Sequence, residues 1–246
     1  PLSPLASTGW LANRLGDPGL VILDTSWYLP STGRNAREEY RVAHIPGAAY
    51  FDLDAASDAT SPLPHMLPSD AEFSRYAGGL GAQNDSAIVV YDGSGGNLSA
   101  ARVWWMFRAF GHDRVALLDG GFGKWLAEGH PVQSGEVGRA SRPFPGHLDR
   151  QRVRDLEDVR RALENGEAQI VDVRSAGRFA GIDPEPRPGL SSGHMPGARN
   201  LPYTDLVGID GTMLSDTALR AKVVAAGIRL DRPLIATCGS GTSACN

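Results

Sequence analysis

The stretch Leu234–Gly241 reads LIATCGSG, an apolar run that ends at a cysteine and continues into small residues. Such a run is typical of a buried strand, and the glycines after it indicate a tight turn. Backbone N–H groups in a turn of this kind can converge on an anion, which favours the thiolate of Cys238 over the thiol. Cys245 is the only other cysteine in the chain. Cys238 is therefore the candidate nucleophile, and a buried structural cysteine is the alternative.

The same pattern occurs in the first half of the chain, where residues 88–95 read IVVYDGSG. Two further segments recur at nearly the same offset. They are VILDTS at 21–26 with QIVDVR at 169–174, and AHIPGA at 43–48 with GHMPGA at 193–198. Three matches in the same order predict a tandem duplication of one domain rather than a solenoid of short repeats. Asp92 stands where the second copy has Cys238, so only the second copy can perform thiol chemistry.

Strands alternate with helices along the first copy, which predicts an α/β fold with a mostly parallel sheet flanked by helices. The expected strands are 19–24, 87–91 and 115–118, and the expected helices are 37–41, 71–78, 99–110 and 123–128. We expect an inactive domain at 1–135, a linker rich in Ser, Gly, Arg and Pro at 136–151, and a catalytic domain at 152–246. Only eight residues follow Cys238. The second domain is therefore predicted to lack a helix and a strand, and the natural protein to be longer.

Composition narrows the class of protein. Charged residues make up 21% of the 246 residues, hydrophobic ones 41%, and the net charge is −4. These values predict a globular chain with no general affinity for nucleic acid. No apolar run approaches the ~20 residues that cross a bilayer, so we expect no membrane association. Two cysteines form no disulfide framework, which favours a cytoplasmic, reducing location. The cysteines and histidines are not clustered as zinc ligands, so no metal site is expected.

Several motifs together resemble the rhodanese-type sulfurtransferases. They are the two tandem domains with a cysteine only in the second, HIPGA at 44–48 and HMPGA at 194–198, and the segments 61–68, 102–112 and 178–187. The loop Cys238–Cys245, CGSGTSAC, is similar to that of the mercaptopyruvate-using members, which usually read CGSGVTAC. Thr242 and Ser243 stand where Val and Thr are usual.

This resemblance implies a two-step transfer of sulfur without a cofactor. The thiolate of Cys238 would take the sulfur of 3-mercaptopyruvate, form a persulfide and release pyruvate. An acceptor, such as thioredoxin, a small thiol or cyanide, would then remove the outer sulfur. The resemblance also implies a proton relay of Ser240, His65 and Asp54. Because His65 belongs to the first domain, the site would form between the domains.

The resemblance implies that the substrate carboxylate is bound outside the loop. Arg178 and Arg187 are the candidates, because guanidinium groups match carboxylates bidentately. The remaining candidate binding residues belong to the loop itself: Gly239, Gly241, Thr242 and Ser243. This loop has no cationic side chain. Members of the family that prefer thiosulfate have basic residues there, so a neutral loop favours a substrate with a single carboxylate.

Other interpretations remain beside this one. Arg178 and Arg187 can be solvated charges, His65 a solvated loop histidine and Asp54 a helix cap. Thiosulfate transfer and a non-catalytic persulfide carrier are the alternative functions. A cysteine phosphatase requires an arginine six positions after the cysteine, where this chain has Ala244. Neither glycine-rich loop has the spacing of a nucleotide-binding motif. Both copies keep His44 or His194, which favours a structural role for these histidines.

Overall fold

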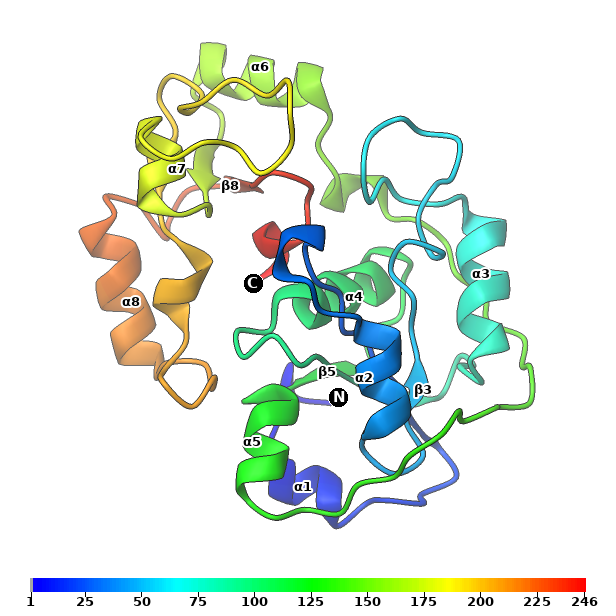
Figure 1. Cartoon of the computed structure of the whole chain (residues 1–246). Helices are drawn as coiled ribbons and strands as arrows, with labels where there is room; N and C mark the ends of the chain where they lie inside the picture. Colours follow the sequence, from blue (N-terminus) through cyan, green and yellow to red (C-terminus); the bar gives the residue numbers. More distant parts are fainter. Residues whose placement is uncertain (1) are drawn as a thin grey trace.

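Two parallel sheets organise the chain, one in each copy of the repeat (Figure 1). The computed structural model describes residues 2–246. The first sheet has the strand order β1-β5-β4-β2-β3 and the second the order β7-β6-β8. The elements of the first copy are β1 (Leu5–Ala6), α1 (Thr8–Ala12), β2 (Leu20–Asp24), η1 (Pro30–Thr32), α2 (Ala36–Val42), β3 (Ala49–Tyr50), α3 (Asp70–Gly79), β4 (Ala87–Tyr91), α4 (Leu98–Ala109), β5 (Val115–Leu118) and α5 (Gly121–Ala127). The later elements are η2 (Arg150–Arg152), α6 (Leu156–Asn165), β6 (Gln169–Asp172), α7 (Ala176–Ala180), β7 (Arg199–Asn200), η3 (Tyr203–Leu206), α8 (Asp216–Ala225), β8 (Leu234–Thr237) and η4 (Ser243–Cys245).

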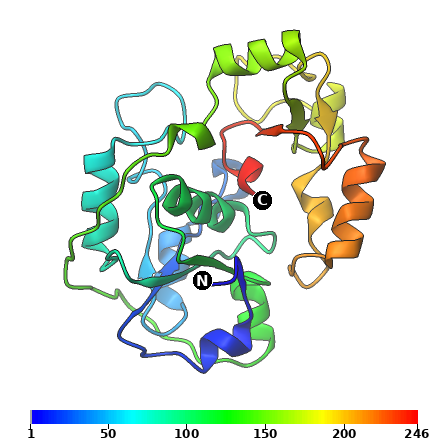
Figure 2. The same cartoon turned by 180° about the vertical axis from the view of Figure 1, so that it is seen from behind.

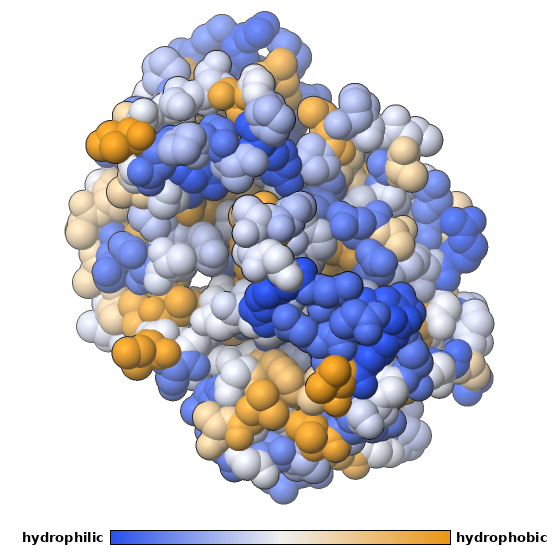
Figure 3. All heavy atoms as spheres, viewed as in Figure 1, coloured by the Kyte–Doolittle hydropathy of each residue, from blue (hydrophilic) through white to orange (hydrophobic). Residues whose placement is uncertain are grey.

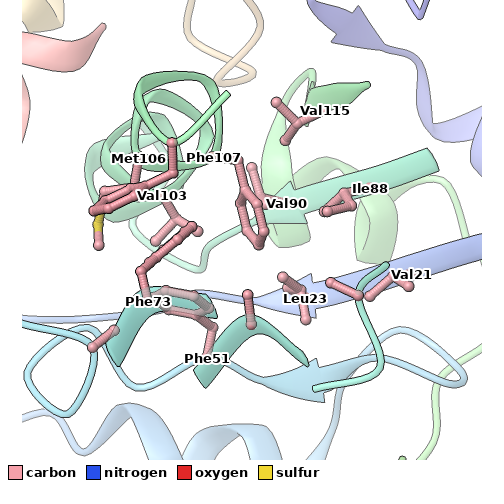
Figure 4. Close-up of a cluster of buried hydrophobic side chains, with 14 of the residues drawn as sticks. Val21, Leu23, Phe51, Phe73, Ile88, Val90, Val103, Met106, Phe107 and Val115 are labelled. Carbon is pink, nitrogen blue, oxygen red and sulfur yellow. The ribbon is translucent and has the colours of Figure 1, made fainter. Parts of the chain in front are cut away.

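The first sheet is buried on both faces, which explains why its strands are continuous apolar runs. Val21, Leu23, Ile88 and Val90 point toward α3 and α4, where they pack with Phe107 and its neighbours (Figure 4). The alternate residues of the same strands face α1 and α5, and pack with Leu11 and Trp125. The expected strands 87–91 and 115–118 are confirmed, and the expected helices occur within two residues of their predicted ends.

The second sheet has a smaller apolar core than the first. Val171, Val173, Leu201 and Ile228 form its buried cluster. Among the described residues, β8 pairs with β6 alone and lies at the edge of its sheet. Leu234, at the start of β8, is 49% exposed. Within residues 2–246, the strand that ends at Cys238 is therefore hydrogen-bonded to β6 only.

The segment predicted as a linker packs against the first domain. Residues 136–149 contain no helix or strand, as expected. Phe144, however, is buried in the first core, and Glu136 forms ion pairs with Arg37 and Arg41. Both arginines belong to α2, and the surface over this helix is strongly hydrophilic (Figure 3). The polar composition identified an irregular segment but did not reveal that its one phenylalanine anchors it.

Past β8, the chain leaves its own sheet and reaches the first domain. The final turn η4 contacts α4, and both views show it beside that helix (Figures 1 and 2). The loop after Cys238 is thus held between the two copies. No helix within residues 2–246 combines the length and apolar character that a bilayer crossing requires.

Candidate active site

Cys238 is half-buried and directly follows the last residue of β8. Burial alone would raise the pKa of its thiol. A hydrogen bond from the Ser243 hydroxyl and others from the backbone N–H groups of Ser240, Ala244 and Gly241 more than offset this, and the pKa is held below its usual range. The loop therefore stabilises a thiolate, as the glycine-rich turn predicted. Ser243, expected among the substrate-binding residues, contacts the sulfur itself.

The equivalent loop of the first domain directs several hydrogen-bond donors at the carboxyl group of Asp92. The Asp92 carboxylate accepts hydrogen bonds from the backbone N–H groups of Ser94 and Ala100, both at 2.8 Å. The hydroxyls of Ser94 and Ser99 also donate to it, at 2.6 and 3.3 Å. The same turn thus binds a fixed carboxylate in one copy and Cys238 in the other. In both copies the loop thus directs N–H and hydroxyl donors at the side chain that follows the strand.

His65 is buried at the domain boundary, 5% exposed, with the left-handed φ of 56° that is uncommon outside glycine. Its Nε2 lies 3.1 Å from Asp54 Oδ1. Trp27 Nε1 donates to the other carboxylate oxygen at 3.0 Å. The hydrogen bond from His65 holds the pKa of Asp54 below its usual range, and the charge of nearby Arg187 acts in the same direction. The expected pairing of His65 with Asp54 is present.

The expected contact between Ser240 and His65 is indirect, and Thr242 lies between them. The distance from Ser240 Oγ to Thr242 Oγ1 is 3.2 Å, and that from Thr242 Oγ1 to His65 Nδ1 is 3.0 Å. Thr242 is 3% exposed. The sequence predicted Thr242 as a substrate-binding residue. Its contact with His65 could not be predicted, because the two residues belong to different domains.

Arg102 joins the two loops, although the sequence gave it no role. It lies in α4, is 5% exposed and stacks on Trp105. Its Nη1 donates to the carbonyl oxygen of Gly241 at 3.0 Å, and its Nη2 donates to that of His65 at 2.6 Å. An arginine inside an apolar helix was the available signal, since a buried charge requires partners.

Arg178 lies against the Cys238 loop, and its charge is paired. Its Nε and Nη2 donate to the two oxygens of Glu185 at 3.1 and 2.5 Å. Glu185 also binds Arg174, which in turn pairs with Asp172. A Cβ on Gly239 would lie only 2.9 Å from Arg178 Nη2, so the guanidinium sits directly over that glycine. Arg178 is therefore fixed in place rather than freely solvated.

A cavity of about 590 Å³ opens beside the nucleophile, between the domains. Its lining includes residues Cys238–Gly241, the loop Leu63–Ser69, Arg150 at the end of the linker and Arg154 just after it. Arg178 and Arg187 do not line it. Half-buried Arg187 has no ion pair within residues 2–246. The loop, His65 and Asp54 are thus connected by hydrogen bonds. Arg178 lies over Gly239 of the loop, and the charge of Arg187 acts on Asp54.

The two repeated histidines pack in the same way, as a structural role predicts. His44 Nδ1 lies 2.8 Å from the carbonyl of Tyr40, and the two rings are stacked. His194 Nδ1 lies 2.7 Å from the carbonyl of Phe179 and stacks on that ring. The described part of the chain contains no group of three or more His, Cys, Asp or Glu side chains that could hold a metal ion.

Known proteins are similar to this chain in sequence and in structure. The profile of the rhodanese-like domain matches residues 7–128 and 155–246. The chain is 47% identical to the 3-mercaptopyruvate sulfurtransferase of Rattus norvegicus and to the thiosulfate sulfurtransferase of Bos taurus, covering 98% of this chain and 83% of each relative. The crystal structure of SseA, a 3-mercaptopyruvate sulfotransferase from Escherichia coli, matches with a TM-score of 0.89 and 38% identity over 99% of this chain and 91% of that one.

Proposed function

The chain belongs to the rhodanese family of sulfurtransferases, and from this we propose that it moves sulfur from 3-mercaptopyruvate to an acceptor through a persulfide on Cys238. The neutral anion-binding loop carries this proposal. Sequence identity does not distinguish between the two possible sulfur donors, because a mercaptopyruvate enzyme and a thiosulfate enzyme are both 47% identical to this chain. The loop Cys238–Cys245 has no cationic side chain, and Glu185 balances the charge of Arg178 beside it. Thiosulfate is doubly negative, and the loop offers no cationic side chain for its second charge.

In the first step the Cys238 thiolate attacks the sulfur of mercaptopyruvate, and the carbon–sulfur bond breaks. The bonding pair leaves with the carbon as the enolate of pyruvate, which then takes a proton. The N–H groups and the Ser243 hydroxyl that favour the thiolate also favour the persulfide anion that replaces it. Splitting the transfer into two displacements is covalent catalysis.

For the substrate carboxylate we propose Arg178 and Arg187. Glu185 engages the Nε and Nη2 edge of Arg178, so Nη1 stays available for a second carboxylate. Arg187 lies near Asp54 and has no fixed partner, which allows it to turn toward the substrate. Gly239 and Gly241 keep the approach to the sulfur free of side chains.

The outer sulfur would pass to a thiol, such as thioredoxin or a small thiol, or to cyanide in an assay. The cavity of about 590 Å³ beside Cys238 has room for such acceptors. With free cysteines and a thiol-dependent reaction, a reducing compartment such as the cytoplasm is the proposed location.

The test is a mass measurement. The protein is incubated with 3-mercaptopyruvate without acceptor and its intact mass is recorded, with Cys238→Ser as the control. We expect the wild type to gain one sulfur atom and the variant none. A larger or faster gain from thiosulfate would favour thiosulfate sulfurtransferase activity. No gain from either donor would favour a binding module.

A further inference from the structure

The hydroxyl of Thr242 is buried and has few possible hydrogen-bond partners. The residue is 3% exposed, so water does not compete for the group. Its Oγ1 has two partners among the described residues, Ser240 Oγ at 3.2 Å and His65 Nδ1 at 3.0 Å. A hydroxyl has one proton and can both donate and accept. With one partner on each side, it forms a continuous path from the loop serine to the imidazole.

Asp54, at the end of the path away from the loop, determines which nitrogen of His65 faces a carboxylate. Asp54, whose pKa is lowered, is an acceptor-only carboxylate at neutral pH. It faces Nε2 of His65, so that nitrogen holds a proton and donates it. Trp27 donates to the second oxygen and keeps the carboxylate in place. Nδ1 is then the nitrogen that exchanges a proton with the loop, and it meets Thr242 rather than Ser240.

We propose that Thr242 is the positioning residue that completes a proton relay from His65 to Ser240 and thereby serves the release of pyruvate. The proposal rests on the function proposed above and deepens it. Among the described residues no hydrogen bond joins Ser240 directly to His65, and each of them contacts Thr242 Oγ1. In this chain the hydroxyl of Thr242 fills that gap.

The relay balances as follows. The enolate takes the Ser240 proton, Ser240 takes the Thr242 proton, and Thr242 takes a proton from Nδ1 of His65. Nε2 stays bonded to Asp54, and Nδ1 regains a proton from the cavity that His65 lines. The persulfide forms as S–SH and releases its own proton on ionisation. In the second step cyanide attacks the outer sulfur, the S–S bond breaks, and thiocyanate and the Cys238 thiolate form. This second step consumes no proton.

That difference between the two steps supplies the test. Thr242→Val keeps the shape of the side chain and removes the hydroxyl. Single-turnover release of pyruvate is measured for the first step. Discharge of the pre-formed persulfide by cyanide is measured for the second. We expect the first rate to fall about tenfold or more, as for loss of a general acid, and the second to stay unchanged. Thr242→Ser restores most of the first rate, and Thr217→Val, on the exposed face of α8, serves as the matched control.

Each other outcome overturns the proposal. Unchanged pyruvate release in Thr242→Val means that the hydroxyl carries no proton. Equal losses in both steps mean that Thr242 only supports the fold of the loop. Failure of the wild type to form any persulfide removes the proposed function itself, and the mass measurement detects that before any variant is made.

Discussion

The Nη1 atom of Arg102 donates a hydrogen bond to the carbonyl oxygen of Gly241, although the two residues are 139 positions apart. The same guanidinium donates to the carbonyl of His65. One side chain of the first domain thus binds the backbone next to the nucleophile and the backbone of the predicted acid–base histidine. The distance between these two loops depends on it.

We therefore expect Arg102→Met to impair both stability and catalysis. Hydrogen bonds from a charged donor contribute about 1.5–3 kcal/mol each, and two carbonyls would lose their partner. The free energy of unfolding should fall by about 3–6 kcal/mol in urea titrations, with a loss of sulfur transfer. Arg108→Met, on the same helix but in a partly exposed ion pair, is the control and should change little. Equal effects of the two variants would contradict this role of Arg102.

The sequence predicts those parts of the site that depend on neighbouring residues and misses those that depend on contacts between the domains. The strand at 87–91 and the loop at Cys238 were predicted, because a buried strand and a glycine turn are encoded by neighbouring residues. His65, Ser240 and Asp54 came from a family resemblance. The bond between Arg102 and Gly241 was not predicted, because it exists only when the two domains dock.

The structure adds tertiary contacts at two places where local pattern does not record them. The segment 136–151 has the composition of a linker, and Phe144, Leu148 and Glu136 hold it against the first domain. Thr242 is predicted to bind substrate, and its buried hydroxyl also faces His65. Periodicity and composition do not reveal such contacts, because the partners are distant in the sequence.

The two cysteines should react at very different rates. Hydrogen bonds hold the pKa of Cys238 below its usual range, whereas burial raises that of Cys245 to about 11. At pH 7 about one Cys245 side chain in ten thousand is then ionised, and the thiolate is the reactive form. Iodoacetamide followed by peptide mapping should label Cys238 first from pH 6 to 9. Cys238→Ser should leave the protein nearly unlabelled, and rapid labelling of that variant would contradict the difference.

Gly239→Ala should weaken substrate binding without unfolding the protein. Its φ is not in the left-handed region, so the backbone tolerates alanine. The new Cβ would lie 2.9 Å from Arg178 Nη2, and Glu185 prevents that guanidinium from moving freely. We expect a higher KM for mercaptopyruvate with an unchanged melting temperature. Gly241→Ala is the comparison: its φ of 72° costs alanine about 1–2 kcal/mol, so it should also lower the melting temperature.

Arg187→Ala should raise KM for mercaptopyruvate about tenfold or more while kcat changes less, if the arginine binds the substrate carboxylate. Arg187 has no ion pair to lose in the described structure, so its removal should not destabilise the fold. Arg160→Ala, on the exposed surface of α6, controls for loss of a positive charge. An unchanged KM in steady-state kinetics would exclude the carboxylate-binding role.

Asp24→Asn should stabilise the protein, and the gain should depend on pH. Burial raises the pKa of Asp24 from 3.8 to about 6 in the folded state. The folded protein therefore holds this proton more tightly than the unfolded chain. The stability that protonated Asp24 contributes is fully present below about pH 3.8 and is lost as the pH rises through 6. Above pH 6 the variant avoids a buried negative charge, and we expect its free energy of unfolding to exceed the wild-type value by about 1–3 kcal/mol.

The equivalent substitution in the second copy of the repeat should lower the free energy of unfolding. Asp172 occupies the position of Asp24 in the second copy, but there Arg174 binds it at 2.5 Å and both side chains are largely buried. Asp172→Asn leaves that arginine without its main partner, and breaking a buried pair costs about 3–5 kcal/mol. Urea titrations at pH 4 and pH 7.5 should show Asp24→Asn gaining only at the higher pH. Asp172→Asn should lose stability at pH 7.5. If both variants changed stability in the same direction there, the environment of Asp24 would not be the apolar one that the structure shows.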